Sequence, residues 1–124
     1  MITELEIIEE FKNGILILHL RGDITKDSGD SLLRLKPWEQ GLDSGTIGVA
    51  LNFSEVEYIN SSGIAALIRL VRLLTSGQYP VGFYHLIFHY EKLFKMVSLT
   101  KYMTIYPSEW AAIEGLSLKK HLVD

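Results

Sequence analysis

Hydrophobic residues near the start of the chain occur in two short runs that predict strands. The runs "LEIIEE" and "ILILHL" are rich in β-branched residues, and the segment "FKNG" separates them. Its Asn13-Gly14 pair is a strong signal for a tight hairpin turn. We therefore predict two antiparallel strands, at about residues 4–10 and 15–20.

Helical spacing follows the hairpin and then gives way to a continuous apolar run. The leucines of "SGDSLLRLKPWEQGL" predict a helix from about Asp27, which Asp27 or Ser28 would cap. Pro37 makes its end fall somewhere between Leu35 and Gln40, because proline disrupts a helix interior. The apolar run "TIGVALNF" predicts a strand at 46–53 that is buried on both faces.

The second half of the chain continues this alternation of helices and strands. In order, the pattern predicts a long helix from Ser61, a strand at 81–86, a helix over 90–99, a strand at 102–106 and a helix from 107. In the 90–99 helix, Leu93, Phe94 and Val97 should face inward. Pro107 and Ser108 suit the N-terminal positions of the last helix.

The predicted order is β-β-α-β-α-β-α-β-α, with no internal repeat or linker. Strands that alternate with helices imply a mixed, mostly parallel sheet with an antiparallel hairpin at its start. At 124 residues, the chain should form a single α/β domain over 1–124.

Composition and charge narrow the function classes. A net charge of −3 argues against charge-driven nucleic-acid binding. The sequence has no cysteine, which excludes disulfides, thiolate catalysis and thiolate metal sites. Neither a secretory signal pattern nor an apolar stretch of about 20 residues is present, so we expect a soluble, cytoplasmic protein with no membrane partner.

The segment "NSSGI" places two hydroxyls and a glycine where a strand turns into the long helix. At about 100° per residue, Ser62 lies opposite the predicted core-facing stripe and in line with Ala65, Ala66 and Arg69. Ser61 falls toward the edge of that stripe and is the better candidate for packing or capping. The stripe consists of Ile64, Leu67, Ile68, Val71 and Leu74.

Helix-terminus electrostatics favour a negative group at Ser62. Asn60 is a good N-cap residue, and the first helical turn offers unpaired N–H groups and the positive end of the helix dipole. A phosphate on Ser62 should therefore be tolerated by the helix and act at the surface. The purely structural alternative is that the serines only cap the helix and Gly63 permits close packing.

Other candidate sites have weaker support. The serine motif is not G-x-S-x-G, and no Asp–His pair completes a hydrolase triad, so a hydrolytic or small-molecule function for Ser62 is a minor alternative. His85 and His89 are four residues apart but do not share a predicted helix, so we expect no metal site. Neither phosphate-binding glycine spacing is present, and we expect no cofactor.

The segment "GFYHLIFHYEKLF" is unusually aromatic. Core packing is the simplest interpretation of these rings. An exposed part of the segment would instead suit a homodimer or a second protein partner.

The stretch "LNFSEVEYINSSGIAALIRLVRLL", followed by "GFYHLIFHYEKLFKMVSLTKYMTIYPSEWAAIEGL", resembles the STAS domain of anti-sigma-factor antagonists. The family hallmark is an apolar strand, a short connection, an acidic residue with two hydroxyl residues and a glycine, and a long helix. "RGDIT" occupies the place of a characteristic upstream turn. The resemblance covers nearly the whole chain and implies the same fold.

The resemblance also implies a function as a switch. The second serine of the motif, Ser62, would be phosphorylated by an ATP-using serine kinase that is also the anti-sigma factor, and a serine phosphatase would reset it. The unphosphorylated domain would bind that partner and release a sigma factor. The implied partner-binding residues are Asp23, Thr25, Asn60, Ser61, Ser62, Gly63, Ala66 and Arg69.

Two positions depart from the family pattern. Asn60 and Thr25 stand where the family usually has aspartates, although Asp23 keeps an acid two positions earlier. A non-switching scaffold or accessory subunit of a transport or stress-sensing complex therefore remains the alternative function.

Overall fold

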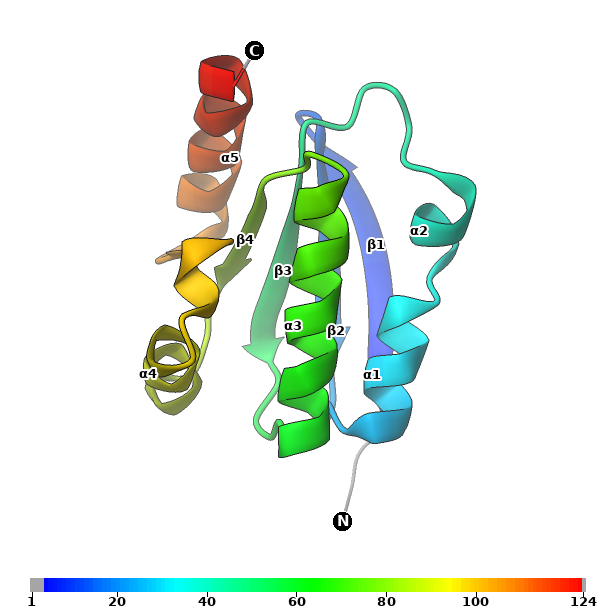
Figure 1. Cartoon of the computed structure of the whole chain (residues 1–124), viewed down its shortest axis with the longest axis vertical. Helices are drawn as coiled ribbons and strands as arrows, with labels where there is room; N and C mark the ends of the chain where they lie inside the picture. Colours follow the sequence, from blue (N-terminus) through cyan, green and yellow to red (C-terminus); the bar gives the residue numbers. More distant parts are fainter. Residues whose placement is uncertain (1–3, 124) are drawn as a thin grey trace.

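The computed structural model describes the backbone of residues 4–123 and the side chains of residues 4–119. It is a five-stranded sheet in the order β1-β2-β3-β4-β5, with helices on both faces (Figure 1). The elements are β1 (Glu6–Lys12), β2 (Ile15–Arg21), α1 (Lys26–Leu33), α2 (Lys36–Gln40), β3 (Gly48–Glu55), α3 (Ser61–Ser76), β4 (Val81–Tyr84), α4 (Phe88–Met96), the 3₁₀ turn η1 (Leu99–Lys101), β5 (Thr104–Tyr106) and α5 (Glu109–Val123).

The sheet topology confirms the predicted mixed, mostly parallel arrangement. Strands β1 and β2 pair antiparallel, whereas β2, β3, β4 and β5 run parallel to their neighbours. The hairpin turn is the predicted one, since Asn13 and Gly14 both have positive φ angles, +54° and +82°. This turn matches the twist of the flanking strands. The first strand begins and ends two residues later than predicted.

The predicted first helix is divided into two. Helix α1 ends at Leu33 and α2 starts at Lys36, which puts Pro37 in the first turn of α2. Proline is accepted there because its missing N–H has no acceptor within the helix. The cap prediction was wrong: Thr25 is the N-cap residue of α1, and its N–H donates to Ser28 Oγ at 2.7 Å.

Side-chain alternation along β2 divides the core between the two faces of the sheet. Leu16, Leu18 and Leu20 belong to a cluster that also contains buried residues of α1, α3 and α4. Ile15 and Ile17 face the other way and pack with Ala112 and Leu116 of α5. Helices α1 and α3 therefore lie side by side on one face, while α5 covers the opposite one (Figure 1).

Two predictions about β4 and α4 were wrong in detail. Strand β4 ends at Tyr84, because His85 adopts a left-handed backbone conformation (φ +59°) and is exposed. Helix α4 ends at Met96, and Val97, which was expected to face inward, is 46% exposed. The predicted N-terminal role of Ser108 is confirmed, since its Oγ accepts the N–H of Ala111 at 3.1 Å.

Helices α1 and α3 approach each other closely at small residues. A Cβ built on Gly29 of α1 would come within 2.6 Å of Ala66 Cβ. One built on Gly63 of α3 would lie 2.1 Å from the carbonyl oxygen of Ile24, just before α1. Because of this contact, the buried face of α3 differs from the predicted stripe. At about 100° per residue, its centre lies roughly 70° around the helix axis from the centre of that stripe, on the side of Ala66. Its buried residues are Gly63, Ala66, Leu67, Leu70, Val71 and Leu74.

Helix α5 is anchored to the sheet through Glu109 at its first residue. Tyr84 Oη donates to Glu109 Oε1 at 3.0 Å, and Lys12 Nζ lies 3.2 Å from Glu109 Oε2. Burial alone would raise the pKa of Glu109, but these two interactions together hold that pKa below its usual value. The charged form of Glu109 therefore favours the folded state.

We predict that replacing Gly63 with alanine destabilises the fold by about 3 kcal/mol, because the new methyl group must displace backbone rather than a flexible side chain. Chemical denaturation at neutral pH measures this. Gly45→Ala is the matched control, since a Cβ there meets nothing within 4 Å. It should change the free energy of unfolding by less than about 1 kcal/mol. Equal effects of the two variants would contradict the packing at Gly63.

We predict that Glu109→Gln makes the protein less sensitive to acid. The folded-state pKa of Glu109 is lowered, so its contribution is present above its unfolded-state pKa of about 4.3 and is lost as the pH falls through the folded-state value. Between about pH 5 and 3, the free energy of unfolding should fall more steeply for the wild type than for the variant. Glu114→Gln, an exposed position on the same helix, should follow the wild-type curve.

Candidate functional site

The N-terminus of α3 is built as the sequence predicted. Asn60 is the N-cap, and its Oδ1 accepts the N–H of Gly63 at 2.8 Å. Its backbone oxygen accepts the N–H of Ile64 at 2.9 Å. Ser61 and Ser62 occupy the first turn, where N–H groups have no acceptor within the helix and the dipole is positive.

Both serines are exposed, as predicted for Ser62. Because the buried face of α3 is turned toward Ala66, Ser62 lies to one side of the exposed face rather than directly opposite the core. Ser61 was expected at the edge of the buried stripe as a packing or capping group. That expectation was wrong, because the buried face of α3 is turned toward Ala66 and Asn60 provides the cap. Arg69 is exposed on the same side of the helix as Ser62.

Two residues assigned to the accessible face are buried. Ala66, expected on the low surface beside Ser62, is only 1% exposed because Gly29 of α1 packs against it. Gly63, which the family resemblance implied as a partner-binding residue, is buried against the carbonyl oxygen of Ile24, as the structural alternative expected. These two residues thus hold the site in place rather than form its surface.

Backbone hydrogen bonds join the "RGDIT" turn to the segment before α3. Gly22 N–H donates to Glu55 O at 3.1 Å, and Asn60 N–H donates to Ile24 O at 3.1 Å. Ile24 also forms a parallel bridge with Ile59. These contacts place the turn beside the N-terminus of α3, where the serines lie.

The residues of that turn that were predicted to bind a partner, Asp23 and Thr25, are half-buried. The backbone oxygen of Asp23 accepts a hydrogen bond from Ser28 Oγ at 2.9 Å, which ties the turn to the first turn of α1. Hollows of about 310 Å³ and 350 Å³ adjoin Asp23 on its two sides. The turn therefore offers a fixed, uneven surface beside the serines.

The connection between β3 and α3 adds residues that the sequence interpretation did not select. Tyr58 is 48% exposed, and Glu55 and Glu57 are exposed beside it. Glu55 forms an ion pair with Arg21, and the hydrogen bond from Arg21 lowers the pKa of Glu55. The sequence signal for Tyr58 is an aromatic residue between Val56 and Ile59, close to the serine motif.

A second group of polar residues lies on the α5 face of the sheet. His19 Nε2 is 2.7 Å from Glu10 Oε1, and ligand atoms of Glu10, His19 and Glu109 all lie within 4.8 Å of one another. A His with two carboxylates has the ligand types that divalent transition metals accept. The sequence interpretation missed this grouping because its members come from three separate elements.

The hydrogen bonds around His19 favour an internally satisfied network over metal binding. Ser54 N–H donates to Asn52 Oδ1 at 3.0 Å, which turns the Asn52 amide nitrogen toward His19 Nδ1 at 2.9 Å. Nδ1 must then accept, so Nε2 carries the proton and donates to Glu10. A metal-bound histidine would instead donate from Nδ1.

The aromatic segment forms most of β4 and of α4, and it is partly buried and partly exposed. Tyr84, Tyr90 and Phe94 are buried in the core, as core packing requires. Phe88 and Met96 are each 73% exposed. Tyr90 also connects α4 to the candidate site, since its hydroxyl accepts the N–H of Ile59 at 2.8 Å.

Among residues 4–123, no helix has both the length and the apolar character that a membrane span requires.

Comparison with solved structures shows the same fold in several proteins of low sequence identity. The anti-sigma factor antagonist SpoIIAA in its unphosphorylated form is 14% identical, with a TM-score of 0.67 over 91% of this chain and 97% of its own. An anti-sigma factor antagonist from Mycobacterium paratuberculosis is 15% identical, with a TM-score of 0.71 over 92% and 95%. A sulfate transporter family protein from Wolinella succinogenes is 12% identical, with a TM-score of 0.69 over 88% and 89%.

No curated protein is a significant sequence match. The STAS domain model, however, matches residues 6–112, which include every strand and all of the candidate site. The chain therefore belongs to the STAS domain family.

Proposed function

We propose that this protein is an anti-sigma-factor antagonist that binds an anti-sigma factor with serine kinase activity and is switched by phosphorylation of Ser62. The observation that carries the proposal is an exposed serine in the first turn of α3, held beside the turn at residues 22–25. In the unphosphorylated state, this surface binds the partner and a sigma factor is released.

A phosphate on Ser62 would act at the surface without unfolding α3. It adds up to two negative charges, and the positive end of the helix dipole with its free N–H groups favours an anion there. The cap bond from Gly63 to Asn60 stays in place, because it lies on the buried side of the turn. The folded domain is thus the same in both states, and only its exposed face changes.

The charges around Ser62 explain why a phosphate on this residue would weaken binding of the partner. The exposed Glu57 and the half-buried Asp23 already make the adjoining surface acidic, while Arg69 lies farther along the exposed face of α3. A phosphate adds like charge to the acidic side and bulk to a surface that must pack against a partner. A charge buried without a counter-ion in an interface costs several kcal/mol.

Related structures support this proposal. The SpoIIAA fold was determined in an unphosphorylated and in a phosphorylated form, and this chain is 14% and 17% identical to those two structures. The exposed serine pair at the start of α3 gives this chain a candidate acceptor. The chain contains neither G-x-x-x-x-G-K-[ST] nor G-x-G-x-x-G, so ATP would come from the kinase and a separate phosphatase would reset the switch.

The second candidate function is a non-switching scaffold or accessory subunit. Asn60 and Thr25 in place of the family aspartates favour it, and so does the likeness to a sulfate transporter family protein. In that case, the same face would hold a constant partner and Ser62 would stay unmodified. Binding that is indifferent to ATP would distinguish this function from the switch.

We predict that Ser62 carries phosphate in native cells and that its occupancy changes between growth and stress. Phosphopeptide mass spectrometry with phosphatases blocked measures this directly. Ser61 lies in the same peptide and is also exposed, so fragment ions must assign the site. A fully covered, unmodified peptide under every condition would exclude the switch and favour the scaffold.

We further predict that Ser62→Asp weakens binding to the partner kinase about tenfold or more, a loss of at least about 1.4 kcal/mol. Ser62→Ala should bind like the wild type, because it adds neither charge nor bulk. Ser76→Asp is the control for charge, because Ser76 is exposed at the other end of α3, and it should bind like the wild type. Calorimetry with the partner recovered from native cells gives the affinities, and equal binding by both Ser62 variants would contradict the proposal.

A further inference from the structure

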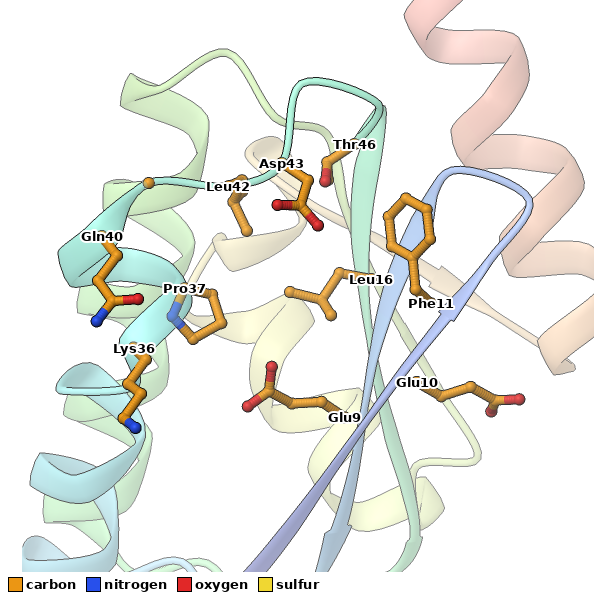
Figure 2. Close-up of a pocket in the computed structure, with 11 residues that line it drawn as sticks. Glu9, Glu10, Phe11, Leu16, Lys36, Pro37, Gln40, Leu42, Asp43 and Thr46 are labelled. Atoms are coloured by element: carbon orange, nitrogen blue, oxygen red, sulfur yellow. The ribbon is translucent and has the colours of Figure 1, made fainter.

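A cleft with a volume of about 410 Å³ lies at the opposite end of the sheet from the serines. It is bordered by the β1–β2 hairpin, by α2 and by the connection from α2 to β3 (Figure 2). Figure 1 shows these segments at one end of the molecule and the start of α3 at the other. Its size falls within the range of small-molecule sites, about 300–1,000 Å³.

The cleft has an apolar floor and an aromatic residue at its mouth. Leu16 of β2 is only 8% exposed, and Leu42 and Pro37 are half-buried and line the cleft beside it. Phe11 pairs with Leu16 across the hairpin, yet its ring is 53% exposed. An apolar body of a ligand would remove these surfaces from water.

Thr46 is a buried residue whose hydroxyl has no partner among the described residues and stays accessible from the cleft. The residue is 6% exposed, and its Oγ1 makes no hydrogen bond with any residue that the structure describes. Its N–H is bonded to Asp43 O at 2.9 Å, which fixes the turn and aims the side chain into the cleft (Figure 2). A polar group of a ligand in the cleft could therefore form a hydrogen bond with Oγ1 without displacing a bond inside the protein.

The free charges of the cleft are mainly negative. Asp43 points its carboxylate into the cleft near Thr46, and Glu9 lies across from it near Lys36 (Figure 2). Neither carboxylate has a hydrogen bond or an ion pair with the described residues. Glu10 also borders the cleft, but its carboxylate is turned away toward His19. The cleft is therefore lined by two carboxylates without an ion pair, those of Glu9 and Asp43, and by one ammonium group, that of Lys36.

We propose that this cleft binds a small organic cation with an apolar body. Its ammonium group would lie between Asp43 and Glu9 and donate a hydrogen bond to Thr46 Oγ1. Its apolar part would pack on Leu16, and the exposed Phe11 ring would add a cation–π contact. A metal ion does not suit the cleft, because no three carboxylate or histidine ligand atoms of the described residues that line it converge on one point.

Three probe molecules of similar shape test which sign of ligand charge the cleft prefers. Phenethylammonium, 2-phenylethanol and 3-phenylpropionate differ mainly in the terminal group, which is positive, neutral or negative. Amide chemical shifts in ¹H–¹⁵N NMR spectra report where and how tightly each one binds. We predict saturable shifts of the 41–46 amides with phenethylammonium, binding about threefold or more weaker with the alcohol, and no saturation with the carboxylate.

Variants locate the site and separate it from the serine face. Asp43→Asn should weaken phenethylammonium binding about fivefold, and Thr46→Val should weaken it while leaving the protein folded. Glu39→Gln is the control, because Glu39 is exposed on α2 outside the lining of the cleft. Ser62→Asp should also bind the probe normally. Equal binding of all three probes, or no shifts in the 41–46 segment with phenethylammonium, would overturn the proposal.

Discussion

The close contact between Gly63 and the carbonyl oxygen of Ile24 is the constraint on which the serine face depends. A side chain at position 63 would push the first turn of α3 away from the turn at 22–25, because a Cβ there would lie 2.1 Å from that oxygen. The same approach brings Gly29 of α1 against Ala66. Small residues thus let two segments far apart in the sequence form one rigid surface. Gly63 serves the site through packing, while Ser62 is the exposed hydroxyl on which the proposed switch depends.

The two ends of the sheet separate two kinds of chemistry. At the carboxyl ends of β3 and β4, helix starts and backbone bonds create an exposed surface suited to a protein partner. At the other end, a hairpin and an irregular connection enclose a cleft that the unpartnered Thr46 hydroxyl faces. Helix α5 and its Glu109 network stabilise the strands between them from the opposite face. The serine face and the cleft lie on the same sheet but have no residue in common. A substitution in one of them therefore leaves the residues of the other in place.

Features set by neighbouring residues were predictable from the sequence, whereas features set by packing were not. The Asn13-Gly14 turn and the Asn60 cap follow from local backbone preferences, and both are confirmed. Burial of Ala66 depends on α1, which a helical wheel of α3 alone does not contain. Likewise, the Glu10–His19–Glu109 grouping and the Thr46 cleft arise where separate elements meet. Long-range contacts therefore account for most of what the sequence left undetermined in the site.

Asparagine in place of the family aspartate at position 60 changes the electrostatics of the switch more than its geometry. Asn60 Oδ1 still accepts the N–H of Gly63, so the cap is retained. An aspartate there would place a fixed negative charge within two residues of a phosphate on Ser62, and like charges at that distance repel. Asn60 removes this repulsion and leaves the full dipole of α3 available to the phosphate. In the switch that we propose, the phosphorylated state would then be easier to hold, and Asp23 and Glu57 would be the acids near the serine for a kinase to recognise.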